Sequence, residues 1–256
     1  MANVITRLRK LVRILSNRKY LSALIGYRVA AGVEHTAVLN LLGYATVVDI
    51  GANRGQFALV SQGCHPEARV ISFEPLEGPA STFEALFRGN DSVQLHRSAV
   101  GPEVVIDAQM HLSASDDSSS MLPITGTQSS LFPGTEEICT RTVQVAPLDV
   151  SVSADRIAAP ALLKLDVQGF ELQALEGCVS LLSCFRWVYV ECSFVELYEG
   201  QAFADEVIAW LRERNFRLIG VFNMAYDQMG VAIQADFLFT ANELCENPDL
   251  QCQFFS

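Results

Sequence analysis

Hydrophobic and polar positions follow two alternating patterns from Thr46 onward. Short runs rich in β-branched residues recur between longer stretches whose apolar positions repeat every three or four residues. This alternation is typical of a parallel sheet covered by helices. We expect strands near residues 46–50, 69–74, 92–98, 161–166, 186–192, 216–222 and 235–240. We expect helices near residues 55–63, 78–89, 169–182 and 203–214.

Two features modify this simple alternation. The last two strands have no helical pattern between them, which favours an antiparallel hairpin at the end of the sheet. Residues 103–145 have β-rich ends around a segment rich in Ser, Thr, Pro and Gly. Because a long loop inside a compact domain is usually functional or disordered, this insertion is a candidate substrate lid. The predicted fold is therefore α/β and Rossmann-like, with a mostly parallel sheet.

The N-terminal segment has a helical pattern of its own. Residues 4–15 place apolar residues at helical spacing with Arg7, Lys10 and Arg13 between them. A basic amphipathic helix can bind an anionic membrane or an acidic partner, or it can pack its apolar stripe on the protein body. We expect residues 1–43 to form a helical extension and residues 44–256 to form the catalytic domain.

Charge is distributed unevenly along the chain. The first 33 residues hold seven Lys and Arg and no acid, which gives a charge of +7. The remaining residues therefore carry −18, and the overall net charge is −11. A strongly acidic body repels phosphates, which argues against a nucleic-acid substrate. It favours a neutral or cationic small molecule.

Cysteine usage and hydropathy indicate the compartment. The seven cysteines are an odd number without a C-x-x-C pair, so we expect reduced thiols and a cytoplasmic protein. No apolar run approaches the roughly 20 residues that span a bilayer, and the N-terminus lacks a signal-peptide pattern. We therefore expect neither export nor a membrane span, although the basic helix is compatible with peripheral membrane contact.

The strongest motif is VVDIGANRGQFAL at residues 47–59. An apolar strand ends there, the chain turns at Gly51, and a helix opens near Gly55. The exposed N–H groups of such a turn can face polar ligand atoms. The next strand ends in ISFEP, which places Glu74 where its carboxylate can accept hydrogen bonds from ribose hydroxyls. The combination predicts a nucleoside-containing cofactor.

The glycine spacing distinguishes two cofactor classes. Nicotinamide dinucleotides favour G-x-G-x-x-G, but this chain has Asn53 at the middle position and Gln56 where the third glycine would stand. S-adenosylmethionine has no pyrophosphate and needs less anion binding, and Asp49 could meet its ammonium group. We therefore favour S-adenosylmethionine over an NAD-dependent oxidoreductase.

Six ordered blocks resemble the FkbM-type methyltransferases. They are VVDIGANRGQFAL, ISFEP, HRSAVG at 96–101, SSSML at 118–122, LKLDVQGFELQALEG at 163–177 and VYVECSFVELYEG at 188–200. The resemblance implies a class I methyltransferase fold. It also implies O-methylation of a sugar, glycolipid or secondary metabolite. A noncatalytic interaction protein on the same scaffold is the remaining alternative.

The resemblance also implies roles for individual residues. Those implied to line the amino-acid end of S-adenosylmethionine are Asp49, Gly51, Asn53 and Phe57. Glu74 would bind the ribose beside Pro75, and Ser98 and Ala99 would flank the adenine. Asp166, at the carboxyl end of its strand, is also expected to contact the cofactor. The SSSML run would contact cofactor or substrate from the lid, or it is a solvated polar turn.

Three acids are candidate catalytic residues. Asp166 and Glu171 flank a strand-to-helix turn at Gly169, and Glu191 closes the next strand. An alcohol loses its proton with difficulty, so one of these carboxylates could accept it. Alternatively the three could hold a divalent cation such as magnesium, or they could bind the substrate by hydrogen bonds. We do not favour a metal.

The histidines appear less suited to act as the base. His35 precedes the predicted domain, His65 lies at the opposite edge of the sheet, and His96 lies inside a strand. Only His111, which leads into the insertion, is placed to reach a substrate, and a surface role also fits it.

Other side chains carry weaker predictions. Lys164 lies within an apolar strand, where a charge needs a partner, so we expect it to pair with an acid. After Glu191, the side chains that could either wall an acceptor pocket or pack the following helix are Phe194, Leu197 and Tyr198.

Overall fold

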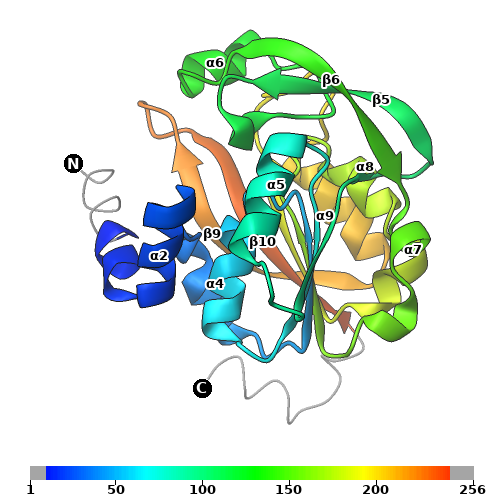
Figure 1. The fold of residues 1–256 in the computed structure, drawn as a ribbon. Coiled ribbons are helices and arrows are strands. Elements are labelled where there is room, and N and C mark those ends of the chain that lie inside the picture. The colour runs from blue at the N-terminus through cyan, green and yellow to red at the C-terminus, as the bar shows by residue number, and fades with distance from the viewer. Residues whose placement is uncertain (1–9, 243–256) are drawn as a thin grey trace.

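The computed structural model describes residues 10–242. Its centre is a seven-stranded sheet in the order β3-β2-β1-β7-β8-β10-β9 (Figure 1). The strands are β1 Thr46–Ile50, β2 Arg69–Phe73, β3 Val93–His96, β7 Ala161–Leu165, β8 Trp187–Ser193, β9 Phe216–Tyr226 and β10 Ala232–Ala241. All neighbouring pairs are parallel except those of β10, which runs antiparallel to β8 and β9. The predicted terminal hairpin is thus confirmed.

The helices between the strands are α4 Gln56–Cys64, α5 Glu77–Leu86, α8 Glu171–Glu176 and α9 Ala204–Glu213. The single helix expected at 169–182 is wrong, because α8 is followed by the 3₁₀ helix Val179–Cys184. At Gly177 the backbone passes so close to Gly101 that a Cβ atom would lie 2.4 Å from the Gly101 carbonyl oxygen. This contact lies at the point where the α-helix ends.

Two apolar layers cover the sheet. On one face Val48, Ile50 and Leu163 pack in a core that includes residues of α8 and α9. On the other face Val47 and Leu162 pack in a core that includes residues of α4, α5 and the N-terminal helices α2 Arg18–Tyr27 and α3 Thr36–Leu41. Because side chains alternate along a strand, one strand serves both layers.

The insertion forms a second, three-stranded sheet. Strand β6 Glu137–Ala146 pairs antiparallel with β5 Val105–Ser113 and parallel with β4 Ala99–Val100. Between β5 and β6 lie the 3₁₀ helix Asp116–Ser118, an isolated β-bridge from Ser120 to His111 and the short helix α6 Gly126–Leu131. Figure 1 shows this layer in green above one end of the main sheet. The insertion is therefore an ordered β-layer.

The N-terminal helix turns its apolar stripe outward. Residues 4–9 of the predicted helix lie outside the described range, and residues 10–16 are helical. Ile14 is buried, whereas Leu11, Val12 and Leu15 remain about half exposed at 45%, 58% and 51%. The alternative in which this stripe packs on the body is wrong for the described turns. Among residues 10–242, no helix combines the length and the hydropathy needed to cross a bilayer.

Candidate active site

A glycine turn after β1 brings three strand ends together. The N–H groups of Gly51 and Ala52 donate to the Phe73 carbonyl at the end of β2, at 3.1 and 2.9 Å. Gly51 has φ +82°, and a Cβ atom there would lie 1.9 Å from the Asp166 carbonyl oxygen after β7. Only glycine permits both this backbone conformation and this approach.

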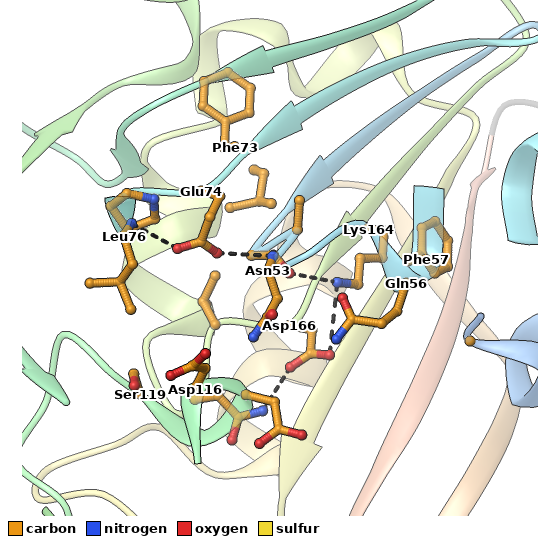
Figure 2. Close-up of a pocket in the computed structure, with 18 of the residues that line it drawn as sticks. Asn53, Gln56, Phe57, Phe73, Glu74, Leu76, Asp116, Ser119, Lys164 and Asp166 are labelled. Carbon is orange, nitrogen blue, oxygen red and sulfur yellow. Dashed lines mark hydrogen bonds and ion pairs between the residues drawn. The ribbon is translucent and has the colours of Figure 1, made fainter. Parts of the chain in front are cut away.

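Glu74 ties the glycine turn to the second strand. Its carboxylate accepts a hydrogen bond from the Asn53 N–H at 2.9 Å and another from the Leu76 N–H at 2.8 Å (Figure 2). Burial raises the pKa of Glu74 to about 7, against the effect of these two donors. Each oxygen keeps a second lone pair that can accept a ligand hydroxyl.

These strand ends border a cavity of about 370 Å³. That volume lies within the range of small-molecule sites. Predicted cofactor residues that line it are Gly51, Asn53, Phe57, Glu74, Pro75, Ala99 and Asp166. Apolar residues also line it, among them Phe73, Leu76 and Met110. The cavity thus combines an apolar wall with a buried carboxylate, which fits an adenosine-bearing ligand. The expected exposed N–H groups of the turn instead donate within the protein, those of Gly51 and Ala52 to Phe73 and that of Asn53 to Glu74.

Two predicted cofactor residues do not line the cavity. Ser98 is not part of its wall, since β3 ends two residues earlier, at His96. Asp49 is fully buried and forms an ion pair with Lys164, 3.0 Å from Nζ to Oδ1. Asp49 is therefore not placed to contact the cofactor ammonium group directly, as the sequence had suggested.

Lys164 instead links the core to the cavity. Its Nζ donates to the Gly51 carbonyl at 3.2 Å and lies 3.8 Å from Asp166 Oδ2. Although burial acts to lower it, the charges of Asp49 and Asp166 raise the pKa of Lys164. The prediction that this buried lysine pairs with an acid is confirmed.

Of the three predicted catalytic acids, only Asp166 lines the cavity. Glu171 turns back to the loop before α8, where its Oε1 accepts hydrogen bonds from the N–H groups of Val167 and Gly169 at 3.0 and 3.2 Å. Its burial raises its pKa to about 7. The expectation that both acids face the cleft is corrected, because Glu171 fixes the turn that presents Asp166.

Glu191 is a buried neighbour of Asp166. It accepts hydrogen bonds from Gln168 Nε2 at 3.0 Å and Gln234 Nε2 at 2.8 Å. Burial and the charge of Asp166 raise its pKa well above the ordinary value. Amide groups thus use oxygen atoms that a cation would need. Within residues 10–242, no three His, Cys, Asp or Glu side chains are grouped to hold a metal.

Gln168 is a site residue that the sequence did not single out. It adopts φ +56°, an uncommon conformation for a residue other than glycine. Its Nε2 donates to Asp166 Oδ1 at 2.7 Å, and its Oε1 accepts from the Tyr198 hydroxyl at 2.7 Å. The side chain therefore connects Asp166, Glu191 and Tyr198. Its occurrence inside the LDVQGFE motif was the available signal.

The insertion closes one side of the cavity. Ser119 and Met121 of the SSSML run line it, and Ser120 Oγ donates to the Gln168 carbonyl at 2.6 Å. Asp116 also lines the cavity and forms an ion pair with Arg54 of the glycine turn. The run is therefore part of the cavity wall rather than a free solvated turn.

The acceptor wall expected after Glu191 takes a different form. Leu197 and Tyr198 are almost fully buried and pack beneath the insertion. The Tyr198 hydroxyl donates to Gln168, and it also lies 3.1 Å from the Ser118 carbonyl. Phe194 is exposed, with its ring 5.8 Å from that of Phe237. Leu197 and Tyr198 therefore do not line the cavity, and the cluster they join includes residues of the insertion rather than of α9.

The histidines are placed differently from the expectation. His111 bonds Glu137 at 2.9 Å and is not part of the cavity wall, whereas His35 lines the cavity. The N-terminal segment around His35 reaches this position because the Gly32 N–H donates to the Gln56 carbonyl at the start of α4. His35 in turn contacts Tyr189 on β8 and Asp236 on β10. Sequence spacing could not reveal these contacts, because they join residues before β1 to strands near the end of the chain.

Comparison with known proteins identifies the family. The methyltransferase FkbM domain family matches residues 49–218. The hexuronic acid methyltransferase AglP of Haloferax volcanii is 29% identical over 146 residues, which cover 56% of this chain and 54% of that protein. The chain thus aligns with about half the length of this relative.

Solved structures show weaker similarity. The Streptococcus pneumoniae protein Sp1610, in complex with S-adenosyl-L-methionine, has a TM-score of 0.46 at 10% identity, covering 85% of this chain and 77% of that one. The magnesium protoporphyrin IX methyltransferase of Synechocystis PCC 6803, with the same cofactor bound, has a TM-score of 0.42 at 10% identity, covering 82% and 80%.

The strand order, the reversed β10 and the cavity at the glycine turn describe a Rossmann-like α/β methyltransferase domain. The family match spans well over half of the sequence. The chain belongs to the methyltransferase FkbM domain family.

Proposed function

We propose that this protein methylates a hydroxyl group of a sugar, glycolipid or secondary metabolite. The observation that carries the proposal is the position of Asp166, which lines the cavity between the Lys164 ammonium and the Gln168 amide. The name of its partial relative, a hexuronic acid methyltransferase, supports a sugar acceptor.

The chain would bind the cofactor along the cavity. Glu74 would accept hydrogen bonds from the ribose hydroxyls, and Pro75 and Ala99 would border the adenosine. Gly51, Asn53 and Phe57 would face the amino-acid end. When bound, S-adenosylmethionine supplies an electrophilic methyl group on a sulfonium.

Asp166 would accept a hydrogen bond from the acceptor hydroxyl and orient its oxygen toward the methyl group. Gln168 holds one carboxylate oxygen, and Lys164 lies near the other. Orientation of this kind supplies a large part of the rate in bimolecular transfers. Glu171 and Glu191 would act through the turn and through Gln168 rather than by direct contact with the acceptor.

The test measures tritiated methyl transfer to a panel of hydroxylated acceptors that includes hexuronic acid glycosides. Asp166→Asn should lower kcat by about 10²-fold or more while retaining cofactor binding. The matched control is Asp205→Asn, an exposed acid at the start of α9, which should leave kcat unchanged. Mass spectrometry of the product should show a methyl ether. Equal rates for Asp166→Asn and wild type would remove the proposed role of Asp166.

Calorimetry separates the rival functions. We expect binding of S-adenosylmethionine and none of NAD, since the NAD-type third glycine is absent. Binding of NAD instead would favour an oxidoreductase. Cofactor binding without transfer to any acceptor would favour a noncatalytic interaction protein.

A further inference from the structure

A buried polar cluster lies behind the cavity, on the side of the N-terminal segment. It consists of His35, Tyr189 on β8, and Asn223 and Asp236 on β9 and β10. Tyr189 and Asp236 are almost fully buried, and the His35 side chain is 14% exposed. His35 and Asp236 both fall outside residues 49–218, so the family match does not assign them a role.

The hydrogen bonds of this cluster favour the His35 tautomer that carries its proton on Nδ1. The Tyr189 hydroxyl donates its only proton to Asp236 Oδ2 at 2.8 Å. The two N–H bonds of the Asn223 amide point to Asp236 Oδ2 at 2.7 Å and to the Tyr189 oxygen at 3.3 Å. His35 Nδ1 lies 3.1 Å from the Tyr189 oxygen, 3.5 Å from Asp236 Oδ2 and 3.4 Å from Asn223 Nδ2. Because Tyr189 donates its proton to Asp236, a proton on Nδ1 has two acceptor oxygens beside it.

A proton on Nδ1 leaves Nε2 of neutral His35 as a lone-pair acceptor. None of the hydrogen bonds among residues 10–242 uses Nε2. His35 lines the same cavity as Asp166 and Lys164. The ring also contacts Phe57 in an edge arrangement, with 5.3 Å between centroids. The imidazole is thus held in one orientation at the edge of the proposed reaction site.

The charged and titratable groups around His35 come from several elements. Asp236 and Tyr189 face it from the sheet, and Asp49 and Asp166 interact with the same cluster through their charges. Lys164 lines the cavity with it. On the N-terminal segment the neighbouring Glu34 is neutralised by Lys10 at 2.8 Å. The groups that face His35 are therefore mainly acids, and Lys164 is a cation that lines the same cavity.

We propose that His35 is the general base of this methyltransferase and that Asp236, acting through Tyr189, orients it. The proposal rests on the proposed O-methylation. The acceptor oxygen forms its bond to the methyl carbon as the methyl–sulfur bond breaks with its electron pair remaining on sulfur. The hydroxyl proton passes to His35 Nε2, and the resulting imidazolium later releases it to solvent.

His35 suits this task better than Asp166. Histidine as a residue type exchanges its proton near neutral pH, which is the condition for efficient general-base catalysis. Asp166 is already engaged by Gln168 and lies near the Lys164 ammonium, so it is suited to orient the hydroxyl. The two residues therefore divide proton acceptance and orientation.

His35→Asn is the decisive variant, because the asparagine amide can keep the donor at the Nδ1 position while removing Nε2. It should lower kcat by about 10²- to 10⁴-fold and abolish the acid limb of the pH profile of kcat. Its Kd for S-adenosylmethionine should stay within about threefold of wild type. Asp236→Asn should lower kcat by a smaller factor than His35→Asn does, and it should shift the acid limb of the pH profile of kcat. His111→Asn, a histidine outside the cavity wall, is the matched control and should retain the wild-type rate and profile.

The outcomes separate this role from the function on which it rests. Absence of a methyl ether with every hydroxyl acceptor would overturn the proposed O-methylation and the role of His35 with it. A methyl ether formed by wild type and His35→Asn at equal rates would overturn the role of His35 alone. Imidazole ¹⁵N NMR gives a readout independent of the acceptor, in which an Nδ1–H tautomer is expected and an Nε2–H tautomer contradicts the proposal.

Discussion

At the residue scale, the cavity depends on side chains whose polar atoms bind the backbone around them. Glu74 joins the glycine turn to the chain after β2, and Glu171 closes the loop that carries Asp166. Gln168 joins that loop to β8 and to Tyr198. Each of these side chains is held in one conformation before a ligand binds. The entropic cost of ordering the site on binding is therefore lower.

Glu74 predicts a pH dependence of cofactor binding. Burial raises its pKa to about 7, and the ionised carboxylate is the form that accepts two ribose hydroxyls. The affinity for S-adenosylmethionine should therefore rise by about tenfold between about pH 6 and about pH 8, as Glu74 loses its proton. Isothermal titration calorimetry at several pH values in this range measures the affinity and tests this expectation.

The matched variants are Glu74→Gln and Glu77→Gln. Glu74→Gln should bind S-adenosylmethionine more weakly than wild type, and its affinity should change little across the pH range. Glu77 is an exposed acid paired with Arg97, so the affinity of Glu77→Gln should change with pH as that of wild type does. An unaltered pH profile in Glu74→Gln would exclude this carboxylate as the source.

At the scale of elements, the carboxyl ends of β1, β2 and β7 place the cavity, and the insertion and the N-terminal segment complete its walls. Parallel strands end at the same edge, so residues distant in sequence meet there. The N-terminal helix contributes Lys10 and Ile14 to the wall and turns Leu11, Val12 and Leu15 to solvent.

This exposed face lies on a helix that also carries Lys10 and Arg13, and it is the basis for a proposal of peripheral binding to an anionic membrane. The protein should co-sediment with vesicles that contain phosphatidylserine and much less with pure phosphatidylcholine. Val12→Glu combined with Leu15→Glu should reduce binding by roughly tenfold or more, because it removes apolar area and adds charge.

Val104→Glu supplies the control for the vesicle experiment. Val104 is similarly exposed, at 64%, but lies next to the insertion sheet. Equal sedimentation of all variants with both lipids would contradict membrane binding through this face.

At the scale of the whole molecule, an acidic protein buries several carboxyl groups near one cavity. Burial raises the pKa values of Glu74 and Glu171 to about 7. Because their unfolded-state pKa values are about 4.3, the folded state binds more protons, and the stability they contribute is lost as pH rises through about 7.

The free energy of unfolding should therefore fall between about pH 5.5 and about pH 8, by about 2 kcal/mol for each of the two groups. Urea denaturation of the ligand-free protein measures this. The double variant Glu74→Gln/Glu171→Gln should flatten the slope, whereas Glu77→Gln/Glu84→Gln, two exposed acids, should not. Increasing stability over this pH range would contradict the expectation.

Several predictions stay predictions at this scale. The division at residues 43 and 44 and the cytoplasmic location are among them. Of the seven cysteines, Cys245 and Cys252 lie outside the described residues. The other five are free thiols, namely Cys64, Cys139, Cys178, Cys184 and Cys192.

The sequence by itself determined the strand positions, the terminal hairpin, the glycine turn and the pairing of Lys164 with an acid. These follow from local periodicity, from the conformational freedom of Gly51 and from the cost of burying an isolated charge. Such constraints act over a few residues or on one side chain, so they are visible in the linear pattern.

Only the tertiary structure decided which polar side chains reach the cavity. Asp49 and Glu191 lie near strand ends and Glu171 begins α8, but their oxygens bind Lys164, glutamine amides and backbone N–H groups, respectively. His35 enters the cavity because a segment before β1 packs beside strands from the end of the chain. Side-chain direction and long-range packing depend on the positions of all neighbours at once, which no local pattern encodes.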